Sequence, residues 1–376
     1  MNYLIVVSYV SLFILGFSDN LRGPLFPEII KYFHVNDTLG AAYFAVTSLV
    51  SFFASYYIRK RKDTYFLLQV LNLGVLAIGV SFLIQSFSQN FLVLILGVFF
   101  LGISFGFLGV SQNNLVIQGS KPHSRSRMLT GLHSMYGISS LLSPLFVASF
   151  GFLGWKNILL ISSLLSFLFF VIVYYLNSKR KKMFREGQAQ NNKEIHPHLQ
   201  WKEKTICFVI SLYVVAEIML GTRLALFMRR YFDSSLEESS FYVTLMFVFM
   251  MIGRLIVSFY PPKWPLKIQL VGSLISSISF LILGMYLNPF FMVLCGFTMA
   301  PFYPLALSYI SELNPQKSSE IVSTTIAIQA LFVVLMHLGV GSIADLTSLK
   351  IAFWIGPICM MASLILLFKT KKEVYE

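Results

Sequence analysis

Charged side chains are scarce in this sequence, and their scarcity excludes most classes of soluble protein. Asp, Glu, Lys and Arg make up 12% of the 376 residues, while 56% are hydrophobic. Soluble domains carry about 25% charged residues, so the chain is expected to lie in a membrane. A backbone in lipid must satisfy its own hydrogen bonds, and alternating strand patterns are absent. The expected fold class is therefore all-α integral membrane protein.

Residue patterns for metal and nucleotide chemistry are also missing. The three cysteines all fall in hydrophobic runs, and no Cys/His spacing suits zinc. There is no nucleotide-binding loop of the form G-x-x-x-x-G-K. We therefore expect no metal, no cofactor, no enzymatic activity and no ATP-driven pumping. The first hydrophobic run lacks the basic region and cleavage site of a signal peptide, so it is expected to persist as a helix.

Twelve hydrophobic segments are long enough to span a bilayer, which takes about 20 apolar residues. A polar, basic stretch separates the sixth from the seventh. We predict a six-helix bundle over 1–177, a cytoplasmic linker over 178–204 and a second six-helix bundle over 205–376. The spans are predicted at about 4–33, 38–58, 64–87, 91–118, 126–150, 156–177, 205–230, 238–260, 267–287, 289–313, 320–344 and 349–368.

Basic side chains are distributed unequally between the two sets of loops. Of the 29 Lys and Arg residues, 21 lie in one set, 5 in the other and 3 within spans. Cytoplasmic loops carry the excess of Lys and Arg, so both termini and the linker are predicted to be cytoplasmic, in a bacterial inner membrane. This topology signal explains the net charge of +13 without a nucleic-acid partner.

Four charged residues lie at matching places in the first and seventh spans. Asp19 and Arg22 fall in the first span, and Glu217 and Arg223 fall in the seventh. Ionisable groups in spans are costly and mark ion or substrate paths by default. Asp19 and Arg22 are three positions apart and share a helix face, which predicts an ion pair. The pair either opens when a proton or solute binds or statically joins the first helix to a neighbour.

The two halves of the chain echo each other. Aligning Tyr32-Phe33 with Tyr231-Phe232 places Asp19 within two positions of Glu217. With six plus six spans and a basic middle loop, the chain resembles the major facilitator superfamily. That resemblance implies two six-helix pseudo-repeats with a substrate site near the membrane midplane between them.

Four short motifs resemble the fucose/glucose permease branch of that superfamily. They are D-N-L-x-x-x-L-x-P from Asp19 to Pro27, GLHSMYGISSLLSPL from Gly131 to Leu145, IGRL from Ile252 to Leu255 and APFYPLALS from Ala300 to Ser308. The resemblance implies symport of a sugar with protons.

The chain departs from that branch at two positions. Where its sugar–proton symporters carry acids in the first and fourth helices, this chain has Gly23 and Gly109. A proton would then have to be carried by Asp19 or Glu217, and if neither carries it the chain is a uniporter or uses another ion.

Polar side chains within the spans are the candidate binding groups. Amides and hydroxyls suit hydroxyl-rich ligands, although hydrogen bonds between helices are the competing explanation. Pro24 and Pro27 are expected to kink the first helix at a gate. Arg254 is expected to pair with an acid or carbonyls of a neighbouring helix, or to reach toward headgroups. The expected cavity residues are Asn20, Gln112, Asn113, His133, Tyr136, Arg223 and Gln329.

These features predict a monomeric secondary transporter that moves a sugar or related small polar solute by alternating access, coupled to protons. The alternative is a proton-driven exporter of drugs or metabolites such as a siderophore. The absence of symport acids and the Phe-rich composition favour that alternative. Import driven by an inward proton gradient distinguishes the first hypothesis from the second.

Overall fold

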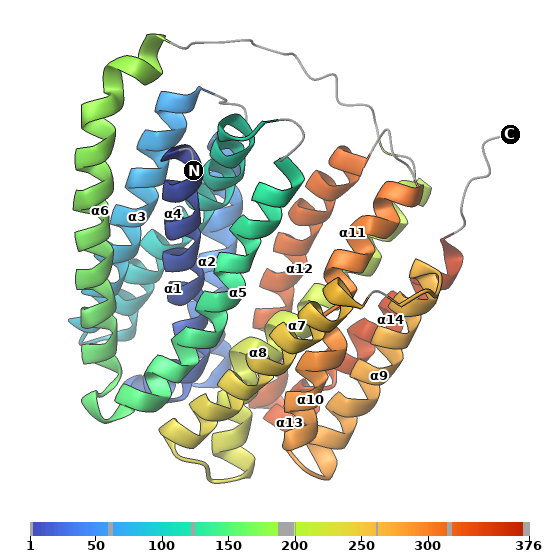
Figure 1. Ribbon diagram of the computed structural model, residues 1–376. Coiled ribbons are helices and arrows are strands. Elements are labelled where there is room, and N and C mark those ends of the chain that lie inside the picture. Colours follow the sequence, from blue (N-terminus) through green and yellow to red (C-terminus); the bar gives the residue numbers. More distant parts are fainter. Residues whose placement is uncertain are drawn as a thin grey trace, which may run out of the picture. The chain divides into compact units, whose positions relative to one another are not determined.

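Helices account for the regular structure of this chain (Figure 1). The computed structural model describes residues 3–58, 63–121, 125–186, 199, 201–260, 262–313 and 318–370, and within these ranges there is no strand. Twelve of the described helical stretches are long and apolar enough to cross a membrane. The predicted all-α fold with twelve membrane spans is therefore confirmed.

The contacts between residues divide the chain into two compact units. Unit 1 comprises Met1–Val35 and Ala42–Glu194. Two of its helices begin at side-chain caps: Asp63 accepts the N–H of Phe66, and Asn90 accepts the N–H of Val93. Its helices are α1 (Tyr3–Phe33), α2 (Asp37–Ile58, from Ala42 onward), α3 (Thr64–Ser86), α4 (Phe91–Gly119), α5 (Arg125–Phe150) and α6 (Trp155–Glu186).

Unit 2 comprises Asn36–Ala41 and Ile195–Glu376. The capping box of Ser235 and Glu238 starts its second long helix. Two of its spans are each made of two helices. The helices are α7 (Trp201–Tyr231), α8 (Leu236–Phe259), α9 (Leu266–Tyr286), α10 (Phe290–Met299), α11 (Phe302–Leu313), α12 (Ser318–Leu346), α13 (Leu349–Ala352) and α14 (Ile355–Lys369).

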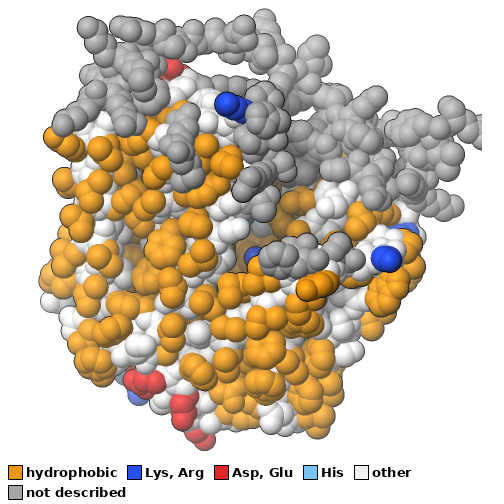
Figure 2. Space-filling model, viewed as in Figure 1, with side chains coloured by type: hydrophobic (Ala, Val, Ile, Leu, Met, Phe, Trp, Pro, Cys, Tyr) orange, Lys and Arg blue, Asp and Glu red, His pale blue; other side chains and the backbone are white. Residues whose placement is uncertain are grey.

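The same pattern of neighbouring helices occurs in both units. In unit 1, α1 packs against α5, and α3 packs against α4 and α6. In unit 2, α7 packs against α12, and α9 packs against α10 and α14. These pairs join corresponding spans, so the two six-helix units are pseudo-repeats. Figure 2 shows hydrophobic side chains over most of the visible described surface, with Asp and Glu near the helix ends.

Two predicted boundaries differ from the structure. The sequence predicts that the sixth helix ends near residue 177, but α6 continues to Glu186. The predicted linker is therefore partly helical, and its residues 187–198 and 200 lie outside the described residues, as do the basic residues 59–62. The tenth span, predicted as one run, is broken into α10 and α11.

Proline explains the break in the tenth span. Pro301 and Pro304 have no N–H, so the helical hydrogen bonds to the carbonyls of Phe297 and Ala300 cannot form. The turn at Ala300 and Pro301 separates α10 from α11. The carbonyl of Ala300 is consequently available to a donor from another helix.

The first turn of α2 belongs to unit 2 through polar contacts. Asp345 of α12 accepts the backbone N–H groups of Asp37 and Thr38 at 2.8 Å and 2.6 Å, and thereby caps α2 from another helix. Arg230 of α7 donates Nη2–H to Asp37 at 2.7 Å as part of a two-pronged ion pair. A Cβ on Gly341 would lie 2.5 Å from the Asp37 carbonyl oxygen, so this glycine permits the approach of α12.

We expect Asp345→Ala to lower the free energy of unfolding by about 1 kcal/mol, because two N–H groups at the start of α2 lose their acceptor. Asp345→Asn keeps an acceptor oxygen and should lose less. The measurement is the thermal unfolding midpoint of the purified protein in detergent. An Asp345→Ala midpoint equal to that of the unchanged protein would refute a capping role.

Candidate functional site

The candidate site in unit 1 is built around the carboxylate of Asp19. This side chain is 27% exposed and forms an ion pair with Arg22 on the same face of α1. Its other oxygen accepts the hydroxyl of Tyr136 on α5 at 2.7 Å. The predicted ion pair is therefore present, and it is joined by a hydroxyl from a second helix.

Arg22 is a buried member of this cluster. It is 5% exposed, and its guanidinium carbon lies 5.1 Å from the ring centroids of both Phe44 and Phe105. Nη1 donates to the hydroxyl of Thr47 on α2 at 2.9 Å. Two aromatic faces and three oxygen acceptors, one of them the Asp19 carbonyl, hold the guanidinium. Arg22 therefore positions and neutralises Asp19 rather than presenting itself to a solute.

Close packing of α1 against α5 brings these groups together. A Cβ on Gly16 would overlap the Ser139 hydroxyl and would lie 2.8 Å from the Tyr136 ring, so only glycine fits without movement. One turn further along α1, Asn20 donates to the Ser140 hydroxyl at 3.0 Å and to the Gly16 carbonyl at 2.7 Å. The Gly16 contact thus sets the distance at which Tyr136 reaches Asp19.

The other predicted residues of unit 1 differ in exposure. Gln112 is fully buried and donates to Ser11 of α1 at 3.0 Å, so it joins two helices and does not line a cavity as predicted. Asn113 is half-buried and donates its amide N–H to the Gly109 carbonyl at 2.8 Å. His133 is exposed on α5, three positions before Tyr136.

The two predicted gating prolines lie inside a continuous helix. Pro24 and Pro27 are buried within α1, which runs on to Phe33. Their missing N–H groups remove two helical hydrogen bonds just beyond Asp19 and Arg22. A gating role for them stays a prediction.

The candidate site in unit 2 is built around Glu217 of α7. Its carboxylate is 21% exposed and lies 3.5 Å from Nη2 of Arg254 on α8. Arg254 also directs Nε–H at the Ala300 carbonyl, 3.4 Å away, where the break in the tenth span leaves that oxygen without its helical donor. The predicted pairing of Arg254 with an acid and a carbonyl of neighbouring helices is present, and its gating role is a prediction.

Aromatic hydroxyls surround this second pair. Tyr213, one turn before Glu217, is 1% exposed, stacks on Phe302 at 4.1 Å and donates to the Met299 carbonyl at 2.7 Å. Tyr303 of α11 is half-buried and within electrostatic reach of Glu217. Two carbonyls at the break in the tenth span are thus bound by side chains of α7 and α8.

Two glycines bring α8 close to α10. A Cβ on Gly253 would lie 2.6 Å from the Phe297 carbonyl oxygen and 2.8 Å from the Ala300 Cβ. A Cβ on Gly296 would overlap the Met246 carbonyl oxygen. The structure therefore explains why a glycine precedes the arginine in the IGRL motif. Gly253 allows α8 to approach α10 closely enough for Arg254 to reach the Ala300 carbonyl.

Two further predicted residues lie deeper in unit 2. Arg223 is 2% exposed, so in this conformation it is not accessible as the predicted solute-binding group. Gln329 of α12 is half-buried, and its amide oxygen makes no hydrogen bond within the described residues. Among the described residues, no three His, Cys, Asp or Glu side chains are placed to hold a metal ion.

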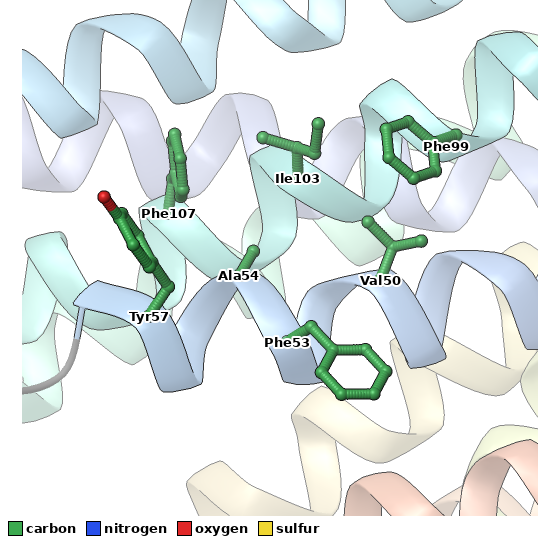
Figure 3. Close-up of a pocket in the computed structure, with 7 residues that line it drawn as sticks. All are labelled: Val50, Phe53, Ala54, Tyr57, Phe99, Ile103 and Phe107. Atoms are coloured by element: carbon green, nitrogen blue, oxygen red, sulfur yellow. The ribbon is translucent and has the colours of Figure 1, made fainter.

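A separate pocket of about 280 Å³ lies between α2 and α4 (Figure 3). Its lining carries no charge, and Tyr57 supplies the only hydroxyl among the seven residues. This pocket does not suit a polar solute and is not the candidate site. The residues are Val50, Phe53, Ala54, Tyr57, Phe99, Ile103 and Phe107.

Several members of the two clusters were not predicted from the sequence. Thr47, Phe44 and Phe105 hold Arg22 from distant parts of the chain, and no local pattern marks them. The Ala300 carbonyl did have a signal, because a proline four positions later deprives it of its helical donor.

Twelve spans in two pseudo-repeats, each with an ion pair inside its spans, define a helical multi-pass membrane protein. The model of the Major Facilitator Superfamily matches residues 8–335. The chain belongs to this superfamily. No curated protein matches it significantly.

Solved structures of other transporters share the fold at low sequence identity. A D-xylose–proton symporter is 11% identical, with a TM-score of 0.73 and 98% of each chain covered. A variant of the E. coli fucose:proton symporter FucP is 14% identical, with a TM-score of 0.65 and 98% of each chain covered. A peptide transporter is 12% identical, with a TM-score of 0.74, and the match covers 98% of this chain and 94% of that one.

Proposed function

We propose that this protein is a secondary transporter that moves a sugar or related small polar solute by alternating access, coupled to protons. One observation carries the proposal: each unit places a partly exposed carboxylate at membrane depth beside an arginine and a tyrosine. Such groups are costly in a membrane and serve ion or solute paths.

The chemistry of the clusters supports a hydroxyl-rich solute. Asn20 offers an amide next to Asp19 on α1, Asn113 an amide on α4 and His133 an imidazole on α5. Tyr303 offers a hydroxyl near Glu217. These groups both donate and accept hydrogen bonds, as sugar hydroxyls do. Two proteins with the same fold are sugar–proton symporters, which supports this solute class.

The two carboxylates are the candidates for carrying the proton. Gly109 has open space where a Cβ would be, and no acid stands there. Asp19 has two donors, the guanidinium of Arg22 and the hydroxyl of Tyr136. Glu217 has a longer contact, 3.5 Å from Arg254, so it is the less strongly bonded of the two carboxylates.

A proton-driven exporter of drugs or metabolites is the second candidate function. Gly23 and Gly109 favour it, because the sugar–proton symporters that the chain resembles carry acids there. Under either function we propose a monomer in a bacterial inner membrane. Both termini are proposed to be cytoplasmic, because Lys and Arg accumulate in one set of loops.

The proposal is tested by uptake of labelled fucose, xylose and glucose into proteoliposomes with an imposed inward proton gradient. We expect gradient-driven accumulation of one sugar, lost in Glu217→Gln because the neutral side chain cannot release a proton. Asp19→Asn is measured alongside as the second candidate. Glu237→Gln is the matched control, since Glu237 is an exposed acid at the start of α8.

Two outcomes separate the hypotheses. Absence of uptake of every sugar by protein that remains monodisperse would refute sugar import and leave the exporter, which is then tested by compound efflux. Full accumulation by both acid variants would refute proton coupling through either carboxylate.

A further inference from the structure

We propose that Arg254 is a positioning residue that can bind either the Glu217 carboxylate or the Ala300 carbonyl. Through this choice, the protonation state of Glu217 controls the bend between α10 and α11. The inference rests on the proposed proton coupling and adds the structural element on which the proton acts. It follows from three features of unit 2: the shared guanidinium, the carbonyl freed by proline and the glycine contact between α8 and α10.

The guanidinium of Arg254 contacts two acceptors, one charged and one neutral. Nη2 lies 3.5 Å from the Glu217 carboxylate, and Nε lies 3.4 Å from the Ala300 carbonyl. Both distances are at the long end of hydrogen bonding, so each contact is weak and can shorten. A change in the charge of one acceptor therefore alters the strength of the other contact.

The Ala300 carbonyl depends on a donor from outside its own helix. Pro304 has no N–H to offer at the i+4 position, and a buried carbonyl without any donor is destabilising. Tyr213 binds the preceding carbonyl, that of Met299, at 2.7 Å. Two side-chain donors, Tyr213 of α7 and Arg254 of α8, therefore stabilise the break between α10 and α11.

A proton taken up by Glu217 changes the relative strength of the two Arg254 contacts. The carboxylate becomes a neutral carboxylic acid, and Arg254 loses its counter-charge. The guanidinium then turns fully to the Ala300 carbonyl and stabilises the bent form of the tenth span. When Glu217 releases the proton, Arg254 moves back toward the carboxylate, and its hydrogen bond to the Ala300 carbonyl weakens.

Among the described ion pairs, Arg254 is the cation that pairs with Glu217, while Arg223 lies six positions later on another face of α7. Tyr213 on α7, Tyr303 on α11 and the Cys295 thiol on α10 are within electrostatic reach and are neutral when protonated. On α14, Gly356 lies against Ala216 and Met219 of α7.

The register of α12 places its described titratable groups, His337 and Asp345, at other levels than Glu217. Hydrogen bonds from Cys207 to Ile321 and from Ser211 to Thr325 show that α7 and α12 run in the same direction with a constant offset. Glu217 is therefore level with Leu331. His337 lies about 9 Å further along the axis, at about 1.5 Å per residue.

The test measures the bend directly, without a solute. Spin labels are attached to cysteines introduced at Phe290 and Ser308, both exposed, after the three native cysteines are replaced by alanine. In a straight helix, the two labelled positions would be separated by about 27 Å at about 1.5 Å per residue. Distances are recorded by pulsed electron paramagnetic resonance in detergent at acid and alkaline pH.

The expected result is a shift to shorter distances at acid pH. Glu217→Gln should show the short distance at every pH, and Arg254→Gln should show no pH dependence. Pro304→Ala restores the helical donor to Ala300, so it should show the longer distance at every pH. Asp19→Asn, in unit 1, should keep the pH-dependent shift.

A pH-dependent shift that persists in Glu217→Gln, or a distance in the parent protein that does not change with pH, would overturn the inference. Either result is independent of transport. A protein that transports no sugar but shows the expected shifts would refute the proposed function while leaving the role of Arg254 intact.

Discussion

Arg22→Met is expected to lower the free energy of unfolding by about 3–5 kcal/mol, since removing one partner of a buried pair leaves the other uncompensated. Arg22 is 5% exposed, between two phenyl rings. Its loss leaves the Asp19 carboxylate with the Tyr136 hydroxyl as its remaining described donor. Methionine fills a similar volume without charge, so the loss reports the ion pair and not a cavity.

The matched variant for this prediction removes both charges. Arg22→Met combined with Asp19→Asn should recover most of the loss, because a neutral amide beside a thioether carries no uncompensated charge. Residues in contact couple by about 0.5–3 kcal/mol in such cycles. The measurement is the thermal unfolding midpoint of the four proteins in the same detergent. If the losses of the two single variants simply add in the double variant, the ion pair does not hold the cluster together.

Gly253→Val is expected to reduce the initial rate of gradient-driven uptake about tenfold or more, which corresponds to about 1.4 kcal/mol in a barrier. The new Cβ would lie 2.6 Å from the Phe297 carbonyl oxygen, so α8 must move away from α10. Arg254 would then lose its position beside the break. The expected stability loss from overpacking is about 1–3 kcal/mol.

Gly272→Val is the matched control for this second prediction. Gly272 lies in α9 with open space where a Cβ would be placed, so the same substitution should leave uptake unchanged. Both variants are compared at equal amounts of monodisperse protein in the liposomes. Equal uptake by the two variants would mean that the approach of α8 to α10 is not required for transport.

The sequence was sufficient to predict the spans and the pseudo-repeat, because lipid imposes length and composition on each helix independently of its neighbours. The pairing of Asp19 with Arg22 was equally accessible, since a spacing of three positions brings two side chains onto one helix face.

Contacts between distant helices were not predictable in the same way. Thr47 and Phe105 reach Arg22 only after α2 and α4 have packed against α1. The sequence predicts that Gln112 lines a cavity, but its side chain is buried against Ser11, because an amide suits either environment. The break at Ala300 lay within reach of the sequence, as two prolines mark it.

The positions of the two ion pairs have a consequence for biosynthesis. Asp19 and Arg22 lie on one helix, so the first span carries its own counter-ion when it enters the lipid. Glu217 lies on α7, but its partner Arg254 lies on α8 and is synthesised later. An isolated charge at the centre of a helix costs about 2.5–3.5 kcal/mol to insert. The seventh span therefore carries Glu217 without this partner until the eighth follows it, and insertion of the two helices as a hairpin supplies the counter-charge.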